Sequence, residues 1–189
     1  FNKASATEEE INAAIQSLNN KIATLVDPTN PVDMTASIVN PKFDDGIKGW
    51  TSTTGAKNNG TADNVCKDPA ANPEGAFDGK FYENWNPSPY TGKMYQVVKN
   101  LPNGVYKCSL AAYTQQFDRN NDVNQKQYVY FNDTKIPLTT GDAKAYSSFI
   151  DVTDNTIEMG LAQDSIISQW LGIDNASLVF YGSGLASYQ

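Results

Sequence analysis

The sequence predicts a mainly β domain, a two-sheet antiparallel β-sandwich of jelly-roll type, with one short helix in front of it. Two observations indicate this fold class. Apolar residues recur at helical spacing only near the start of the chain, whereas from Ser37 onward they alternate with a period of two. Short polar turns separate the alternating runs. We therefore divide the chain into a helical segment with its linker, residues 1–34, and a β-sandwich domain, residues 35–189.

A helix is predicted over residues 5–26. Thr7 and Glu10 form a Thr-x-x-Glu capping box at its start, and the proline-containing run at 27–31 ends it. One stripe of the helix is apolar and consists of Ile11, Ala14, Ile15, Leu18, Ile22 and Leu25. An isolated helix of this length is marginal in water, so the stripe has to be buried. Two alternatives remain open: the stripe packs on the domain that follows, or the helix is the last one of a domain that precedes it.

About nine strands are expected in the rest of the chain. Gly104–Gln115 alternates, with its even-numbered residues on one face and its odd-numbered residues on the other. Residues 102–104, Pro-Asn-Gly, supply a tight turn before it, and Asn132-Asp133 can join a hairpin. Further strands rich in β-branched and aromatic residues are Tyr128–Asn132, Tyr146–Val152, Thr156–Ala162 and Ile173–Tyr181. Short strands with polar turns in this number are typical of a two-sheet sandwich.

Composition and charge restrict the partners. Hydrophobic residues make up 40% of the 189 residues, which is enough for a core, and the formal net charge is −7. Arg119 is the single arginine, so the chain lacks the basic patch that nucleic acid or an anionic membrane requires. No run approaches the roughly 20 apolar residues that span a bilayer. Because the chain opens at Phe1 without a signal peptide, we expect an exported, processed protein that is extracellular, at the cell surface or periplasmic.

Catalytic devices are difficult to assemble from these residues. The chain has no histidine, which removes the commonest general base and the commonest transition-metal ligand. Neither a zinc-type Cys/His spacing nor a glycine-rich phosphate loop is present. A carboxylate pair for glycoside hydrolysis is the remaining route, with the candidates Glu74, Asp78, Glu83 and Glu158. Since scattered carboxylates on a sandwich are usually solubility charges, an enzyme is the weakest alternative.

Aromatic side chains give the clearest candidate site. Ten tyrosines and three tryptophans exceed what a core of this size requires, and sugars stack their C–H faces on such rings. Phe81–Tyr90 is predicted as a proline-stiffened loop in which Trp85 and Tyr90 are stacking surfaces, although a core position for Trp85 is an equal alternative. The other ligand-binding candidates are Tyr82, Asn84, Gln115, Asp118 and Arg119. For Arg119, a buried pair with a carboxylate is as plausible as a ligand contact.

Two long polar segments, Asn58–Pro73 and Phe117–Gln125, are predicted as functional loops. Trp50 and Trp170 adjoin strand starts and are expected in the core or at a sheet edge. The two cysteines, Cys66 and Cys108, are expected to lie close enough to pair. Two small buried hydrophobic side chains are the alternative to a disulfide.

Three motifs resemble those of carbohydrate-binding modules with the galactose-binding-like jelly-roll fold. Ile38–Thr51 is similar to the family's opening NPxF…GW strand, Leu101–Cys108 to its LPxGxY turn and strand, and Trp170–Gly182 to its closing strand. Their order and spacing agree over residues 37–182. The resemblance extends to modules of surface glycan-utilisation proteins of gut bacteria, in which a helical segment often precedes the sandwich. These motifs are mainly structural, so they specify the fold better than the ligand.

The resemblance also implies a structural calcium ion between the first and last strands. The matching positions are Asp44 or Asp45 and Asp174, and carboxylates are suitable ligands for calcium. Asp44 stands where the family has glutamate, and Ile173 stands where an aromatic residue is expected. The alternative is that Asp174 bonds to backbone and Asp44 opens a turn.

Taken as a sequence, the chain is therefore expected to be a non-catalytic module that binds an oligo- or polysaccharide, joined to other domains of a larger surface protein. No cofactor is required for this function. A structural spacer or adhesion module that binds protein is the alternative from a different class. Exposed aromatic rings beside polar groups would favour sugar, whereas a smooth polar face would favour the spacer.

Overall fold

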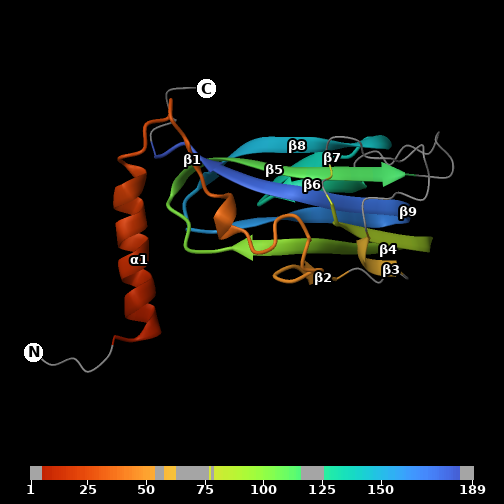
Figure 1. The fold of residues 1–189 in the computed structure, drawn as a ribbon, viewed down its shortest axis with the longest axis horizontal. Coiled ribbons are helices and arrows are strands. Elements are labelled where there is room, and N and C mark those ends of the chain that lie inside the picture. The colour runs from red at the N-terminus through yellow and green to blue at the C-terminus, as the bar shows by residue number, and fades with distance from the viewer. Residues whose placement is uncertain (1–5, 54–57, 63–76, 78, 116–125, 184–189) are drawn as a thin grey trace, which may run out of the picture.

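The computed structural model describes residues 6–53, 58–62, 77, 79–115 and 126–183. One helix precedes a set of antiparallel strands. The elements are α1 (Glu8–Ala23), β1 (Val32–Asp33), a 3-10 turn (Thr35–Ser37), β2 (Thr51–Ser52), β3 (Asn58–Ala62), β4 (Phe81–Val98), β5 (Gly104–Gln115), β6 (Gln127–Phe131), β7 (Thr134–Pro137), β8 (Gly141–Val152) and β9 (Ile157–Phe180). Figure 1 shows the strands lying lengthwise beside one another, with α1 standing across one end of them.

Two long strands, β4 and β9, pair with each other along most of their length and belong to both sheets. The C-terminal half of β4 and the N-terminal half of β9 form the first sheet, with β2 on one side and β6 and β7 on the other. Their other halves form the second sheet with β3, β5 and β8. The β4–β9 register shifts between Asn84 and Gly92, because bulges let the strands bend where they pass between sheets. The predicted antiparallel sandwich is thereby confirmed.

The core lies between the sheets and follows the predicted alternation. Tyr106, Cys108 and Leu110 on β5 are fully buried, whereas Lys107 between them is exposed. Burial raises the pKa of the Cys108 thiol to about 12. Cys66 lies outside the described residues, so its proximity to Cys108 stays a prediction. Trp50 is in the core, as expected.

The opening motif is structural, as its resemblance implied. The Asn40 side chain donates to the Gly46 carbonyl (2.9 Å) and accepts from the Asp45 amide (3.1 Å), which ties the loop between 3-10 turn and β2 into one unit. The Trp50 indole donates to the Asn40 carbonyl (3.1 Å). The ring of Phe43, itself fully buried, packs 4.7 Å from that of Trp50, centroid to centroid. The NPxF…GW residues therefore hold a loop and plug the core.

A buried chain of polar side chains lies where the two sheets meet. Thr114 donates to Gln127 (2.5 Å), and Gln127 donates to Gln163 (2.8 Å). Gln163 in turn donates to the carbonyls of Tyr90 (3.3 Å) and Ile166 (2.5 Å), both in the irregular part of the β4–β9 pair. Gln163 therefore satisfies two carbonyls in the irregular stretch, and Gln127 and Thr114 hold the Gln163 side chain in place.

The helix has the predicted capping box between Thr7 and Glu10. However, it does not pack its apolar stripe on the sandwich. Its polar residues face the sandwich: Asn19 donates to the Asn100 carbonyl (2.8 Å), and Asn20 accepts from the Asn103 amide (3.2 Å). The large members of the apolar stripe are exposed instead, namely Ile11, Ile15, Leu18, Ile22 and Leu25. Packing of the stripe on the following domain is therefore wrong, because asparagine side chains occupy that interface.

Replacing Gln163 with leucine should destabilise the domain by about 2–4 kcal/mol, because two backbone carbonyls and the Gln127 amide would lose their partner in a buried site. Urea unfolding of Gln163→Leu against the wild type measures this difference. Ser147→Ala, an exposed change on β8, is the control and should alter the free energy of unfolding by less than about 0.5 kcal/mol. A neutral Gln163→Leu would contradict the role assigned to the polar chain.

Candidate functional site

The predicted aromatic loop is in fact the N-terminal half of β4, which corrects the sequence interpretation. Phe81–Tyr90 lies within the strand Phe81–Val98, and its residues pair with β3 and β9. Because side chains alternate along a strand, the ten residues divide between two faces. Tyr82 and Asn84 point into the sandwich, whereas Glu83 and Trp85 belong to the outer face and are half-buried.

The inward-facing candidates form a hydrogen-bonded chain. Tyr90 donates its hydroxyl to Asn84 Oδ1 (2.5 Å), and Asn84 Nδ2 donates to the Tyr82 hydroxyl (3.2 Å). Tyr82 has no exposed surface and Asn84 has 1%. These two predicted ligand contacts are corrected accordingly: both residues belong to the interior, where they hold Tyr90 and the strand beneath the outer face. Tyr90 is half-buried, and its role in stacking stays a prediction.

Trp85 shares the outer face of the second sheet with residues of β9 and β5. Glu83 pairs with Gly172 across β4 and β9, and Gly172 pairs with Tyr113 on β5. A Cβ atom at Gly172 would lie 2.5 Å from Cε1 of Tyr113, so the Tyr113 ring lies over the position that the glycine leaves open. We call Glu83, Trp85, Gly172, Tyr113 and, by its place on β5, Gln115 the Trp85 face.

Backbone register places Gln115 two strands from Trp85. Gln115 pairs with Trp170, and the neighbouring Leu171 pairs with Asn84, so β9 runs between the two predicted site residues. Two strand spacings correspond to about 10 Å, a separation that one or two sugar rings can bridge. The remaining candidates, Asp118 and Arg119, lie outside the described residues and stay predictions, as does the Phe117–Gln125 loop. Of the other predicted loop, residues 58–62 form β3.

A second apolar cluster supports the Trp85 face from one side. Its buried members are Phe77, Phe81, Ala111, Tyr113 and Ala143. The ring of Phe77 lies 4.9 Å from that of Phe81 and 5.5 Å, edge-on, from that of Tyr113, measured between centroids. Since this cluster is on the outer side of the second sheet, it fixes Tyr113 at the border of the face.

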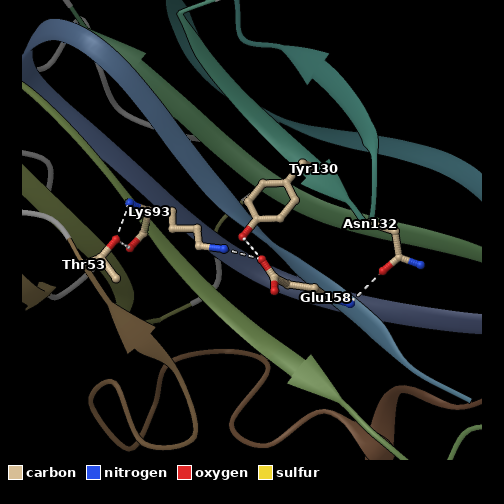
Figure 2. Close-up of polar contacts among 5 residues, drawn as sticks. All are labelled: Thr53, Lys93, Tyr130, Asn132 and Glu158. Atoms are coloured by element: carbon tan, nitrogen blue, oxygen red, sulfur yellow. Dashed lines mark hydrogen bonds and ion pairs between the residues drawn. The ribbon is translucent and has the colours of Figure 1, made fainter. Parts of the chain in front are cut away.

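A different aromatic group, which sequence reasoning missed, lies on the outer face of the first sheet. We call it the Lys93 cluster; it consists of Lys93, Tyr95, Tyr128, Tyr130 and Glu158. Figure 2 shows its centre, where Glu158 Oε1 accepts hydrogen bonds from Lys93 Nζ (2.5 Å) and from the Tyr130 hydroxyl (2.8 Å). The residues come from β4, β6 and β9. The only sequence signal for this cluster was the alternation of polar and aromatic residues along each strand. Which of these residues meet depends on how strands distant in sequence pair, and the sequence does not give that pairing.

The Lys93 cluster is arranged for stability rather than for stacking a ligand. Lys93 Nζ lies 4.1 Å from the centroid of the Tyr95 ring, and Lys135 Nζ lies 4.6 Å from that of Tyr128. The two ring faces are therefore already covered by cation–π contacts. Burial works to raise the pKa of Glu158, but the hydrogen bonds from Lys93 and Tyr130 outweigh it, so the pKa lies below its ordinary value. Burial, and then the bond to Glu158, raise the pKa of Tyr130.

The two described carboxylate candidates for glycoside hydrolysis, Glu83 and Glu158, lie far apart. Glu83 pairs with Gly172 near the start of β4, whereas Glu158 pairs with Val97 near its end. The intervening strand corresponds to a path of about 45 Å at the usual rise per residue. Glycosidases hold their carboxyl groups about 5–10 Å apart, so these two residues do not form such a pair. Glu74 and Asp78 lie outside the described residues.

The predicted calcium ligands do not converge in an evident way. Asp44 and Asp45 are exposed, and Lys48 forms an ion pair with Asp45 (2.8 Å) that lowers the pKa of that carboxyl. Asp174 is fully buried on β9. Among the described residues, no three acidic, histidine or cysteine side chains gather as a metal site. An ammonium group on Asp45 opposes its use as a ligand, so the calcium ion stays a prediction and nothing below depends on it.

The sequence matches no protein family and no curated protein, but solved structures share its fold. An apo form cyclase from Fischerella sp. superposes with a TM-score of 0.55 and 13% identity, over 79% of this chain and 96% of that one. TmCBM61, solved in complex with β-1,4-galactotriose, gives 0.50 and 18%, over 74% and 94%. The enzymatically active domain of bacteriophage CBA120 tailspike protein 4 superposes with a TM-score of 0.54 and 13% identity. The superposition covers 75% of this chain but only 21% of the tailspike chain.

These similarities define the class of the domain: a jelly-roll β-sandwich of the kind found in carbohydrate-binding modules. Because the same fold also occurs in a cyclase and within a tailspike enzyme, the fold alone does not assign a function. Within the described residues, the model contains no helix of the length and apolarity needed to cross a membrane.

The lowered pKa of Glu158 makes its contribution to stability depend on pH. A carboxyl group whose pKa is lower in the folded than in the unfolded protein stabilises the fold at pH values above its unfolded pKa, which is near 4.3. This stabilisation is lost as the pH falls through the pKa of the folded state. Glu158→Gln should therefore cost about 0.5–1 kcal/mol at pH 7, since the pair is partly exposed. Below about pH 3 the difference from the wild type should nearly vanish.

Urea unfolding at both pH values measures this dependence, and Lys93→Gln supplies the matched control. In a Lys93→Gln background, Glu158→Gln should lose most of its effect at pH 7, because the ion pair is already absent. An equal cost of Glu158→Gln at low and neutral pH would show that the carboxylate charge is not what stabilises the cluster.

Proposed function

We propose that this domain is a non-catalytic carbohydrate-binding module that binds an oligo- or polysaccharide on the Trp85 face. The single observation that carries the proposal is the placement of Trp85, half-buried on the outer face of β4, two residues from Glu83 and two strands from β5. A half-buried indole is fixed by its neighbours yet keeps a surface for stacking. It thus loses little conformational entropy when a sugar binds.

The surroundings of Trp85 suit a sugar ring. Aromatic surface provides the stacking contact, and Glu83 offers carboxylate oxygens that accept hydrogen bonds from hydroxyl groups. The buried Tyr113 ring fills the space beside Gly172 and so supports the surface next to Glu83. The site rests on strands rather than on a long loop, so Trp85 and Glu83 keep their positions before the ligand arrives.

Export and attachment to other domains belong to the same proposal. The low basic content and the absence of histidine agree with a surface module that acts by neutral hydrogen bonding and aromatic contact. A position outside the cytoplasm, in a larger surface protein, would give such a module access to polysaccharide. The comparison with TmCBM61 supports the ligand class, because that protein was solved with β-1,4-galactotriose.

A glycan array followed by calorimetry tests the proposal, with β-1,4-galactotriose as the first probe. Trp85→Ala should weaken binding of the best ligand by about tenfold or more, which corresponds to about 1.4 kcal/mol or more for the lost stacking contact. Glu83→Gln should weaken it less, since an amide oxygen still accepts hydrogen bonds.

Phe149→Ala is the matched control, because Phe149 is a large exposed aromatic residue on β8 that lies outside the Trp85 face. Its affinity should equal that of the wild type. A thermal melt of each variant separates loss of binding from loss of folding. Absence of binding to every glycan would favour a structural spacer over a carbohydrate-binding module. Equal glycan affinities of Trp85→Ala and Phe149→Ala would show that the site is not on the Trp85 face.

A further inference from the structure

The apolar stripe of the N-terminal helix remains uncovered in this structure. Its large residues have exposed fractions of 39% (Ile15) to 60% (Leu18) within α1, and Leu25 in the turn after α1 reaches 82%. Single exposed apolar residues are ordinary, but a continuous row of four along one helix, extended by a fifth in the turn after it, marks a contact surface. The row consists of Ile11, Ile15, Leu18, Ile22 and Leu25.

The opposite side of the helix is already occupied. Ala23 is 1% exposed and its carbonyl accepts from the Ser183 amide (3.3 Å). Asn19 and Asn20 bond to the turns at Asn100 and Asn103. Rotation of the helix to bury the row on its own sandwich would break these contacts. The row is therefore available to pack against a surface other than its own sandwich.

The spacing within the row identifies the kind of surface. Within α1 the row has intervals of four, three and four residues, from Ile11 through Ile15 and Leu18 to Ile22, and Leu25 follows in the turn. These intervals are those of the a and d positions of a heptad, the seam along which one helix packs on another. A flat sheet or an irregular loop does not require this spacing. The partner is thus an α-helix with a similar seam.

The charges on the helix favour a second copy that runs in the opposite direction. Its first turn contains Glu8, Glu9 and Glu10, and its last turn contains Lys21. A parallel pair would bring the two acidic turns together, whereas an antiparallel pair places each near the lysine and the negative dipole end of the other helix. The row is also nearly symmetric about Leu18, since Ile15 lies three residues before it and Ile22 four residues after it, so reversal leaves each of these residues within one position of the other.

From these observations we infer that the chain self-associates through an antiparallel pair of α1 helices related by a two-fold axis. Leu18 meets Leu18 of the other copy at the axis, Ile15 packs against Ile22, and Ile11 packs against Leu25. The Ile15–Ile22 and Ile11–Leu25 contacts each occur twice, as in an isologous interface. The short seam makes the association dependent on concentration. The inference is independent of the glycan site, which lies on the outer face of the second sheet.

Sedimentation velocity of the full chain over a wide range of concentration tests the inference. The wild type should shift from monomer to dimer, and Leu18→Lys should weaken dimerisation by at least about a hundredfold, because two ammonium groups would meet at the axis. Since Leu18 is exposed in the monomer, its circular dichroism and thermal midpoint measured at low concentration should stay unchanged. Ala13→Lys, also exposed but outside the row, should dimerise like the wild type.

Cysteine cross-linking under mild oxidation determines the direction. Leu18→Cys should form a disulfide-linked dimer, whereas Ala13→Cys and the wild type should not. Ile11→Cys alone should remain monomeric on a non-reducing gel, but mixed with Leu25→Cys it should cross-link. A wild type that is monomeric at every concentration would overturn the inference and leave the row to a helix of another polypeptide. Efficient cross-linking of Ile11→Cys alone would overturn the antiparallel arrangement.

Discussion

The antiparallel pairing of β4 with β9 is the constraint on which the sandwich depends, because both strands pass through both sheets. Every other strand in the two sheets attaches to this pair directly or through one neighbour. Its bend occurs at bulges, where Gln163 satisfies two backbone carbonyls and is itself held by Gln127 and Thr114. Both sheets are thus built on β4 and β9, which run lengthwise among the other strands in Figure 1. The outer face of the first sheet carries the Lys93 cluster, and the outer face of the second carries Trp85.

Features encoded by neighbouring residues could be predicted from the sequence. Alternation over twelve residues predicted Cys108 and Lys107 on opposite faces of β5, and the structure buries the first and exposes the second. The capping box marked the start of the helix. The opening motif is similarly local, since Asn40 bonds within its own loop. Such patterns depend on backbone geometry alone, which is why they predict the fold class and the core without knowledge of the strand order.

Features that depend on distant strands could not be predicted. Two prolines favoured a loop at Phe81–Tyr90, because proline cannot donate to a ladder; in the structure the prolines are exposed in the irregular stretch, where Asn86 donates to the Ser88 carbonyl (2.7 Å). Tyr82 and Asn84 were assigned to the ligand since their types suit a sugar, but strand parity buries them. The Lys93–Glu158 pair joins residues far apart in sequence, so no local pattern indicated it.

The account separates a binding face around Trp85 from a stabilising cluster around Lys93, and one measurement distinguishes them directly. A ¹H–¹⁵N correlation spectrum resolves one indole signal for each of the three tryptophans. On titration with the best glycan from an array, the Trp85 indole and the amides of Glu83, Gly172 and Tyr113 should shift, while the buried Trp50 indole stays in place. Shifts centred on Tyr95, Tyr128 and Glu158, with the Trp85 signal unmoved, would contradict the account.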